Sequence, residues 1–486
     1  MATINVENYG AKHDGSTDDS GAIQSAVEDA QDGDTVKLPG ADNPYLVSTG
    51  GRAAVDLAAS GVTADDLTIR GDPEETVMLL NRESANPACM GGENTENAKW
   101  NTITVEGIIF DGDKATNGDG TAFKWYADAE VTGRDITIFN CLFRNAVRGG
   151  YSESPEGISQ TTVRYCTGRN NDSHGFNPQG IAGNSTLSDP DTRIFNILSI
   201  DNDGSGIDFH GGVHDCSAVY VENPGSHGLK AGAAGGKTER LRITGATIKD
   251  PPLYGWTQTS DGSFSHDGTF TFDNFRVDGA GEAGIRADEG VTIEIGTAMV
   301  ERSGNTSNGN THQFMTDDTA VFDADEIVSQ NAHEGDGIFH ASTGTSTVSQ
   351  YFHYDIPGDA VDVFNGTVNI SEQYNQEQAT LETPTKDEVG AFTAATGTAD
   401  PDSGPQPETA QGRTEAGGED RGIRGNMILP RFVGSFLQPV DIATLDTVYM
   451  PAQEPEKPSF GAVVYYDNAD DELKIKRADG TVKTIA

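Results

Sequence analysis

A short pattern recurs along the chain between Gly150 and Gly337: a turn rich in Asn and Asp, then glycine, then a large apolar residue. The intervals between successive glycines are 25, 31, 22, 27, 29 and 53 residues. The last interval is about two of the others, with Asn308-Gly309 near the skipped position. A repeating interval of this kind is typical of a solenoid. The pairs are Gly150-Tyr151, Gly175-Phe176, Gly206-Ile207, Gly228-Leu229, Gly255-Trp256, Gly284-Ile285 and Gly337-Ile338.

Apolar and turn-forming positions keep fixed distances from these glycines. Nine residues before each glycine the side chain is apolar, and twelve before it is apolar again, with Asp325 as the exception. No repeat contains the 3.6-residue apolar period of a helix, so short strands fit better. Five residues before each glycine stand types that mostly tolerate a left-handed turn, namely Asn145, Asn170, Asp201, Asn223, Asp250, Gly279 and Ala332. The pattern predicts an all-β fold, a right-handed parallel β-helix over residues 40–375.

The first 39 residues predict a cap for this solenoid. Asp19 or Ser20 begins a stretch with one apolar helical face, formed by Ala22, Ile23, Ala26, Val27 and Ala30. A β-helix exposes the end of its core, and an amphipathic helix there would cover it.

The same stretch carries a resemblance to a known family. Tyr9-Gly10-Ala11, Asp14-Gly15 and Asp18-Asp19 precede Ala22-Ile23-Gln24, and this order resembles the N-terminal signature of the pectate-lyase-like superfamily. The resemblance implies a parallel β-helix. It leaves the chemistry open, because that family includes lyases, glycosidases and virus tail spikes.

The apolar pattern stops near Glu377. Residues 376–425 are predicted to be an extended linker. Residues 426–486 are predicted to be a region for attachment or oligomerisation, with three strands at 463–466, 473–476 and 482–485. Such a small meander cannot bury a core alone. It resembles the C-terminal modules of phage tail-fibre proteins, and it predicts a homotrimer.

Charge narrows the setting in which the chain folds. The formal net charge is -44, from 76 acidic and 32 basic residues. Molar salt would screen this self-repulsion over roughly 3 Å, so the composition predicts a halophilic source. High charge also favours disorder, but the ordered columns argue against that for most of the chain. Nucleic-acid binding is not expected, because no basic face is visible.

Cysteine and hydropathy patterns predict no cofactor, no metal site and no membrane insertion. The four cysteines, at 89, 141, 166 and 216, have no metal-binding spacing. Cys141 and Cys166 share an interior column, so a disulfide between them is sterically conceivable. No apolar run of 18 residues appears, and no signal peptide precedes Ile4. The chain is therefore expected to be made in the cytoplasm of its host, or to leave by another route.

A polar face is predicted on the strands that follow the glycines. Alternate side chains point outward, so the second residue after each glycine forms a ladder that includes Thr257 and Phe339. The residues before the glycines add His174 and Tyr254. Such a mixture is typical of a sugar-binding groove, although an ordinary solvent face would also be polar. The predicted glycan-binding residues are Asn177, Gln179, Asp208, His210, His227, Lys230, Arg286 and Asp288.

Catalysis on this face has only incomplete support. Hydrolysis with inversion needs two carboxylates about 6.5 to 9.5 Å apart, and Asp201, Asp203 and Asp208 could supply them with help from His210 or His227. Polygalacturonases carry Asn-x-Asp, Asp-Asp, Gly-His-Gly and Arg-Ile-Lys on successive coils, and the spacing here differs from that. Asp201 and Asp203 fit turn positions better.

A lyase would need a cationic base beside a calcium cluster. Lys230 and Arg286 are possible bases, but no adjacent cluster of Asp residues is visible.

The sequence therefore predicts a virion structural protein of a halophilic virus, one that infects a haloarchaeon. It would be a tail spike, tail fibre or capsid decoration that adheres to a host-surface glycan and contacts other virion proteins through its C-terminal region. The alternative is a polysaccharide lyase or glycoside hydrolase acting on cell-surface polysaccharide. A third interpretation is a cellular adhesin.

Overall fold

The computed structural model divides into two units, Met1–Thr385 and Lys386–Ala486, which are considered separately. The structure describes residues 1–49, 51–73, 75–82, 87–126, 134–153, 160–180, 191–232, 238–258, 269–288, 290–304, 311–375, 462–467, 472–477 and 482–485.

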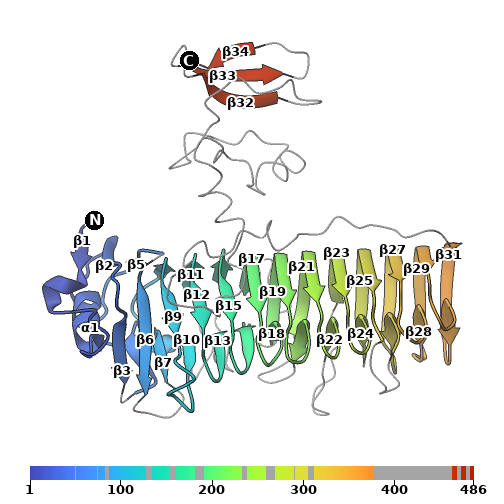
Figure 1. Cartoon of the computed structure of the whole chain (residues 1–486), viewed down its shortest axis with the longest axis horizontal. Helices are drawn as coiled ribbons and strands as arrows, with labels where there is room; N and C mark the ends of the chain where they lie inside the picture. Colours follow the sequence, from blue (N-terminus) through green and yellow to red (C-terminus); the bar gives the residue numbers. More distant parts are fainter. Residues whose placement is uncertain are drawn as a thin grey trace. The chain divides into compact units, whose positions relative to one another are not determined.

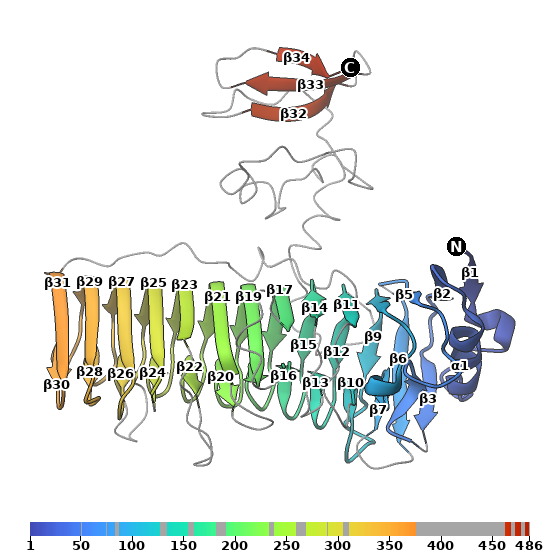
Figure 2. The same ribbon diagram turned by 180° about the vertical axis from the view of Figure 1, so that it is seen from behind.

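The first unit is a right-handed parallel β-helix, as the sequence predicts. Figures 1 and 2 show its strands stacked side by side along the long axis, with α1 at one end and β31 at the other. Two parallel sheets form its sides, one of 12 strands and one of 19 strands. Each turn of the chain adds a strand to both sheets, so residues between 22 and 36 positions apart in sequence become neighbours, as for Ile194 with Cys216 and Asp66 with Thr102.

The 12-stranded sheet contains short strands in the order of the chain. They are β4 (Ala53–Asp56), β7 (Ala88–Gly92), β10 (Thr121–Trp125), β13 (Gly149–Ser152), β16 (His174–Asn177), β18 (Ile207–His210), β20 (Leu229–Gly232), β22 (Trp256–Gln258), β24 (Ile285–Ala287), β26 (Phe314–Thr316), β28 (Ile338–His340) and β30 (Val361–Val363).

In the 19-stranded sheet, two strands of each early coil later merge into one long strand. The separate strands are β1 (Thr3–Asn5), β2 (Asp34–Leu38), β3 (Tyr45–Thr49), β5 (Asp66–Gly71), β6 (Val77–Arg82), β8 (Thr102–Glu106), β9 (Ile109–Asp111), β11 (Asp135–Phe139), β12 (Leu142–Arg144), β14 (Thr161–Arg164) and β15 (Thr167–Arg169). The long strands are β17 (Thr192–Ile200), β19 (Gly212–Glu222), β21 (Thr238–Lys249), β23 (Thr269–Asp278), β25 (Thr292–Glu301), β27 (Val321–Gln330), β29 (Thr345–Tyr354) and β31 (Thr367–Asn375).

The predicted interior columns are confirmed through most of the solenoid. Ile194, Cys216 and Ile243 are direct partners on successive strands, and Phe272 follows. All are almost completely buried. Because like positions lie over like, each apolar side chain packs on the coils before and after it.

The coil before Gly337 departs from the predicted columns by one residue. Ala324 and Ile327 pair with Ile295 and Ala298 in the core, whereas Asp325 is exposed. The left-handed residue is Asn331, with φ 52°, in place of Ala332. Each position predicted by counting back from Gly337 is therefore wrong by one residue, because the turn before Gly337 contains one extra residue.

The skipped coil is also placed differently from its prediction. Phe314 pairs with Ile285 and Ile338, so Gln313 takes the register position of the glycine. The predicted Asn308-Gly309 lies outside the described residues.

Left-handed turns occur where the sequence predicts them in the other coils. The backbone φ is positive at the predicted positions, a conformation that Asn, Asp and Gly tolerate: Asn145, Asn170, Asp201, Asn223, Asp250 and Gly279.

The N-terminal helix is α1 (Ser20–Asp29), preceded by the 3-10 helix η1 (Val6–Tyr9), and a second 3-10 helix, η2 (Thr95–Asn97), lies further along the chain. Ile23, Ala26 and Val27 are buried against the first coils. Asp19 is the N-cap residue, but its side chain makes no capping bond. Its carboxylate instead accepts from the backbone N–H groups of Lys12 and His13, at 2.7 and 3.0 Å. The acidic signature therefore shapes the loop before the helix.

All four cysteines are buried and free. Cys141 and Cys166 share a column as predicted, and the backbone N–H of Cys141 lies 3.4 Å from Cys166 Sγ. The conceivable disulfide is absent.

The second unit contains three described strands, β32 (Ala462–Asp467), β33 (Glu472–Arg477) and β34 (Val482–Ile485). They pair antiparallel in chain order, which confirms the predicted meander. The predicted linker, 376–425, lies outside the described residues.

Candidate functional site

The candidate site is one row of side chains on the outside of the 12-stranded sheet, here called the outer ladder. Strand register brings together residues that are far apart in sequence, and their alternate neighbours, such as Tyr151, Phe176 and Trp256, fill the core. The row follows the predicted ladder and extends it at both ends. In order it contains Gly91, Lys124, Ser152, Asn177, Asp208, Lys230, Thr257, Arg286, Met315, Phe339 and Asp362.

Asp208 is the centre of a cluster of charged groups. Its Oδ2 lies 3.3 Å from Lys230 Nζ and 3.4 Å from the Nε2 atoms of both His174 and His210. The residue is only 2% exposed. A buried carboxylate is tolerated when cations and hydrogen-bond donors surround it. The sheet therefore holds three positively charged or proton-accepting groups around one acid.

Burial and neighbouring charges set the protonation states of the groups in this cluster. Burial alone would raise the pKa of Asp208, but the hydrogen bond from His210 and the nearby positive groups lower its pKa to about 2. Burial lowers the pKa of His174. Burial, together with the Lys230 charge, lowers the pKa of His227 to about 4. At neutral pH the site thus presents a carboxylate, an ammonium group and neutral imidazoles that accept protons.

Three buried polar atoms of the site have no hydrogen-bond partner within the described part of the chain. They are Asp208 Oδ1, His210 Nδ1 and His227 Nδ1. Leaving such groups unpaired costs about 1–3 kcal/mol each. The cluster therefore holds donors and acceptors that its own side chains do not satisfy.

Aromatic rings continue the site beyond Lys230. The rings of His227 and Tyr254 are stacked, with centroids 5.5 Å apart and planes 4° apart. Arg286 Nη1 donates to Tyr254 Oη at 2.9 Å, and Arg286 Nη2 lies 3.0 Å from Asp288 and 3.1 Å from Asp317. The guanidinium is thereby held in one orientation on the ladder.

The far end of the ladder is more apolar. The ring of His312 stacks on the ring of Phe339, with centroids 4.2 Å apart. The Nδ1 atom of His312 lies 3.0 Å from Asp336 Oδ2. Met315 is buried in a small surface cluster with Tyr254. Stacked rings beside charged groups combine the aromatic and polar side chains that sugars contact.

The structure brings the predicted glycan-binding residues together to different degrees. Asp208, His210 and Lys230 are in direct contact, and the Lys230 charge acts on His227. Asn177 Nδ2 donates to the backbone oxygen of Asp208 at 3.2 Å. Arg286 and Asp288 pair two strands further along.

Gln179 has a largely internal position. It is 4% exposed, and its backbone N–H donates to Glu153 Oε2.

Asp201 and Asp203 lie in the turn before Gly206 and both are exposed. Asp201 has φ 52° and accepts from Asn223 Nδ2 at 3.0 Å. The backbone N–H of Asp203 donates to Asn171 O. Neither carboxylate contacts Asp208 among the described contacts, which agrees with the turn assignment.

Sequence reasoning missed Glu153, whose carboxyl group lies inside the solenoid. Tyr151 Oη donates to Glu153 Oε1 at 2.6 Å. Burial raises the pKa of the Glu153 carboxyl group to about 7. The outward positions did not include this residue, because Glu153 is the third residue after Gly150, an inward position where the alternation predicts an apolar side chain. His312, Met315 and Lys124 were missed for a different reason, since their coils lack the marking glycine.

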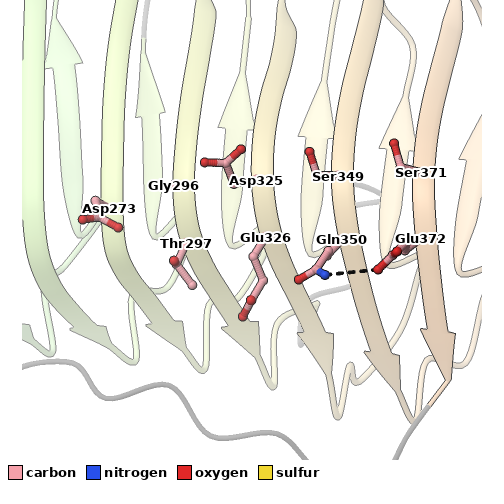
Figure 3. A pocket seen from close by; sticks show the side chains of 9 residues that line it. All are labelled: Asp273, Gly296, Thr297, Asp325, Glu326, Ser349, Gln350, Ser371 and Glu372. Atoms are coloured by element: carbon pink, nitrogen blue, oxygen red, sulfur yellow. Dashed lines mark hydrogen bonds between the residues drawn. The ribbon is translucent and has the colours of Figure 1, made fainter.

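A second polar surface lies on the 19-stranded sheet, here called the acidic groove. It has a volume of about 780 Å³. Figure 3 shows its side chains on successive strands, with Gln350 Nε2 donating to Glu372 Oε2 at 3.1 Å. Its lining residues are Asp273, Gly296, Thr297, Asp325, Glu326, Ser349, Gln350, Ser371 and Glu372.

Within the described ranges no group of three or more His, Cys, Asp or Glu side chains has a geometry that could hold a metal ion. No helix among those residues is long and apolar enough to cross a membrane.

Comparison with known proteins supports the fold. No family model matches the chain. The mannuronan C5-epimerases AlgE3 and AlgE1 of Azotobacter vinelandii are 27% and 26% identical to it, over 210 and 209 residues. Each match covers 41% of this chain but only 11% and 14% of those relatives' own lengths. The chain therefore resembles a small part of much longer proteins.

The likeness to solved structures covers more of the chain. The A-module of A. vinelandii mannuronan C-5 epimerase AlgE6 has a TM-score of 0.55 at 20% identity, covering 77% of this chain and 100% of that module. The AlgE4 A-module has a TM-score of 0.51 at 18% identity, covering 79% and 100%. The pre-mature bacteriophage phi29 gene product 12 has a TM-score of 0.53 at 14% identity, covering 78% and 56%. The chain has the fold of these proteins. At such low identity, the likeness extends to the β-helix alone.

Proposed function

We propose that the chain is a virion structural protein, a tail spike, tail fibre or capsid decoration, whose outer ladder binds a polysaccharide of the host surface. The observation that carries this proposal is the continuous row of carboxylate, cationic and aromatic side chains from Asn177 to Phe339, together with the histidine and tyrosine rings that contact it. Buried polar atoms without partners lie within it. Neighbours of this fold include both polysaccharide epimerases and a phage gene product.

The salt environment of the virus is inferred from the net charge of the protein. A net charge of -44 repels itself strongly unless salt screens it, so a halophilic host is the setting we propose. The melting temperature should rise steeply with KCl or NaCl. A melting temperature that stayed the same between roughly 0.1 and 3 M salt would contradict the halophilic setting.

Assembly is inferred from the C-terminal region. Residues 426–486 would anchor the protein to other virion proteins, and three chains would together form a homotrimer. Binding through three copies is multivalent, so weak single contacts suffice. Light scattering of the purified protein tests this, and a mass of one 51.3 kDa chain would contradict it.

The binding proposal is tested on virus particles. Asp208→Ala combined with Lys230→Ala removes both partners of an ion pair on the ladder. The matched control, Glu222→Ala with Lys249→Ala, removes a pair whose Nζ and Oε1 atoms lie 3.9 Å apart on the 19-stranded sheet. The ladder variant should assemble but adsorb poorly to host cells, while the control adsorbs normally. Equal adsorption by both variants would contradict the proposal.

The anchoring proposal needs its own variant. Deleting residues 451–486 should yield particles that lack the protein. Particles that still carried the truncated chain would contradict attachment through this region.

A second candidate function is cleavage of an acidic polysaccharide by a lyase reaction. His174 and His227 are neutral at physiological pH and lie near the Lys230 ammonium group. A neutral imidazole could take the proton from the carbon beside a sugar carboxylate whose charge Lys230 offsets. The bond to the leaving oxygen would then break, forming a double bond in the sugar. Hydrolysis is less compatible, because an Asp208 with a pKa of about 2 is not a general acid at neutral pH.

The lyase candidate has a direct assay. Host envelope polysaccharide incubated with the protein would gain the ultraviolet absorbance of unsaturated sugar ends, and His227→Gln would abolish the gain. Adsorption without any unsaturated product leaves binding as the function of the ladder.

A further inference from the structure

A carboxyl group lies inside the solenoid, close behind the outer ladder. Glu153 follows β13 and is 2% exposed. Its carboxylate accepts two hydrogen bonds, from Tyr151 Oη to Oε1 at 2.6 Å and from the backbone N–H of Gln179 to Oε2 at 2.5 Å. In the described part of the chain no cation pairs with it. An apolar side chain would fill this inward position at less cost, so the acid needs a specific explanation.

The undescribed residues next to Glu153 contain no group that could supply the missing positive charge. Residues 154–159 and 181–190 include two acids but no Lys, Arg or His. Burial raises the pKa of Glu153 to about 7, and the negative charge of Asp191 adds to this, although the two hydrogen bonds lower it. Further acids nearby would raise the same pKa. Glu153 is therefore an acid that changes its charge near neutral pH.

The other polar side chains of this interior region are neutral. Thr161, Thr192 and His214 follow one another in one column on successive coils. His214 Nε2 lies 2.6 Å from Gly211 O, and burial lowers the pKa of His214 to about 4. The imidazole is thus uncharged at neutral pH and does not act as a counter-charge for the acid.

The hydrogen bond from Gln179 leads to the centre of the ladder. The residues on either side of Gln179 hold the backbone of His210, whose N–H donates to Pro178 O at 3.1 Å and whose carbonyl oxygen accepts from Gly180 N–H at 2.8 Å. His210 Nε2 in turn lies 3.4 Å from Asp208 Oδ2. Residues 178–180 therefore connect the buried acid to the Asp208 cluster.

This network can take up a proton without losing the connection. Thr161 Oγ1 acts on the pKa of both Tyr151 and Glu153, yet it has no hydrogen-bond partner among the described groups. A proton on Glu153 Oε1 can be donated to Tyr151 Oη while the Tyr151 hydroxyl turns toward Thr161. Oε2 then still accepts from Gln179. The charge of the acid and its hydrogen bond can therefore be varied separately.

We propose that Glu153 is a positioning residue of the outer ladder, which holds residues 178–180 in place and through them holds His210 against Asp208. The inference rests on the proposed function, because it takes the Asp208 cluster to be the centre of binding. It adds that the ladder responds to pH through a group that the ligand does not touch.

The first test measures the hydrogen bond itself and needs no polysaccharide. In nitrogen-15 NMR spectra of the whole protein, the Gln179 amide signal should shift with a midpoint near pH 7, as Glu153 loses its proton. Glu153→Gln keeps the shape and one acceptor oxygen but should remove this midpoint. Tyr151→Phe removes a donor to the carboxylate, so the midpoint should rise. A Gln179 amide that titrates identically in the wild type and in Glu153→Gln would overturn the inference.

The second test measures the position of His210. Glu153→Leu fills a similar space without an acceptor for Gln179, so the carbon-13 signal of the His210 ring should shift at a fixed pH, whereas Glu153→Gln should keep the wild-type signal. The matched control is Glu301→Leu, which removes a buried carboxylate that accepts from Gln330 Nε2 at 3.1 Å on the 19-stranded sheet. An unchanged His210 signal in Glu153→Leu, or an equal shift in the control, would also overturn the inference. Melting curves check that each variant is folded, and the Gln and Phe variants decide if Glu153→Leu is not.

Binding is then measured with purified host envelope polysaccharide. Glu153→Leu should weaken binding on the order of tenfold, while Glu153→Gln and Glu301→Leu retain most of the affinity. Equal losses in the two Leu variants would overturn the inference and leave the proposed function in place. A wild type that does not bind through the ladder overturns the proposed function, and the NMR signals of Gln179 and His210 still decide whether Glu153 positions His210.

Discussion

The outer ladder and the acidic groove are both polar rows built by the same repeat, yet their side chains are arranged very differently. On the ladder, Asp208 is 2% exposed and lies against Lys230 and two imidazoles. In the groove, Asp325 is exposed and Glu326 is only partly buried, and the Gln350 amide donates to the Glu372 carboxylate.

This difference separates a site from a solvated surface. Mixed charges held out of water are expensive to assemble and are coupled to one another. Exposed acids of one sign interact weakly and are screened by salt. A polar row on a β-helix is therefore weak support for binding by itself, and burial with compensating charges is stronger support.

The largest expected effect comes from removing the acid at the centre of the ladder. Asp208→Asn leaves the Lys230 ammonium group without its counter-charge and replaces the acid that His174 and His210 contact, so it should lower the free energy of unfolding by about 4 kcal/mol. Asp325→Asn in the groove should change it by less than about 0.5 kcal/mol. Urea unfolding measures both. Similar effects at the two positions would remove the distinction between the surfaces.

An intermediate effect is expected from pH. The folded pKa of His227, about 4, lies below the unfolded value of about 6.5. The unfolded chain binds the proton first, so the stability that the neutral imidazole preserves is full above pH 6.5 and is lost as pH falls toward 4.

His227→Gln removes this proton linkage. Over that window the wild type should lose about 3 kcal/mol more stability than the variant, as measured by unfolding at a series of pH values. Parallel pH profiles would show that His227 titrates as it does in water.

The smallest effect is expected in the groove. Glu326→Gln removes one acid near Asp325 and Glu372, so it should raise the free energy of unfolding by about 0.5 kcal/mol at low salt. Screening should erase the gain in molar salt. A gain that persisted at high salt would indicate packing in place of charge repulsion.

Sequence predicted the solenoid well because each coil repeats the same physical constraint. Ile243 and its column neighbours must be apolar, and Asn223 or Asp250 must accept a left-handed turn. Core positions counted from each glycine were wrong where a turn contains an extra residue, as in the turn before Gly337. It also missed coils in which another residue takes the glycine's place, Gln313 in one and Ala122 in another.

The composition of the ladder was predictable, but its interactions were not. Alternation places Asp208 and Lys230 on the same face. Whether they meet, and how deeply they are buried, depends on side-chain packing across three strands, β16, β18 and β20. Lys124 was missed altogether, because its coil has Ala122 at the position where the pattern expects glycine. Strand pairing was needed to place Lys124 on the same row as Asp208.

The central claim is that the outer ladder is the surface that meets a polysaccharide. Hydroxyl-radical footprinting of the protein, with and without purified host envelope polysaccharide, tests it most directly. The account predicts that the polysaccharide lowers oxidation of Tyr254, Met315 and Phe339, and leaves Phe139, Tyr165 and Tyr354 on the 19-stranded sheet unchanged. Protection of Tyr165 or Tyr354 with no protection of Tyr254, Met315 and Phe339 would contradict it.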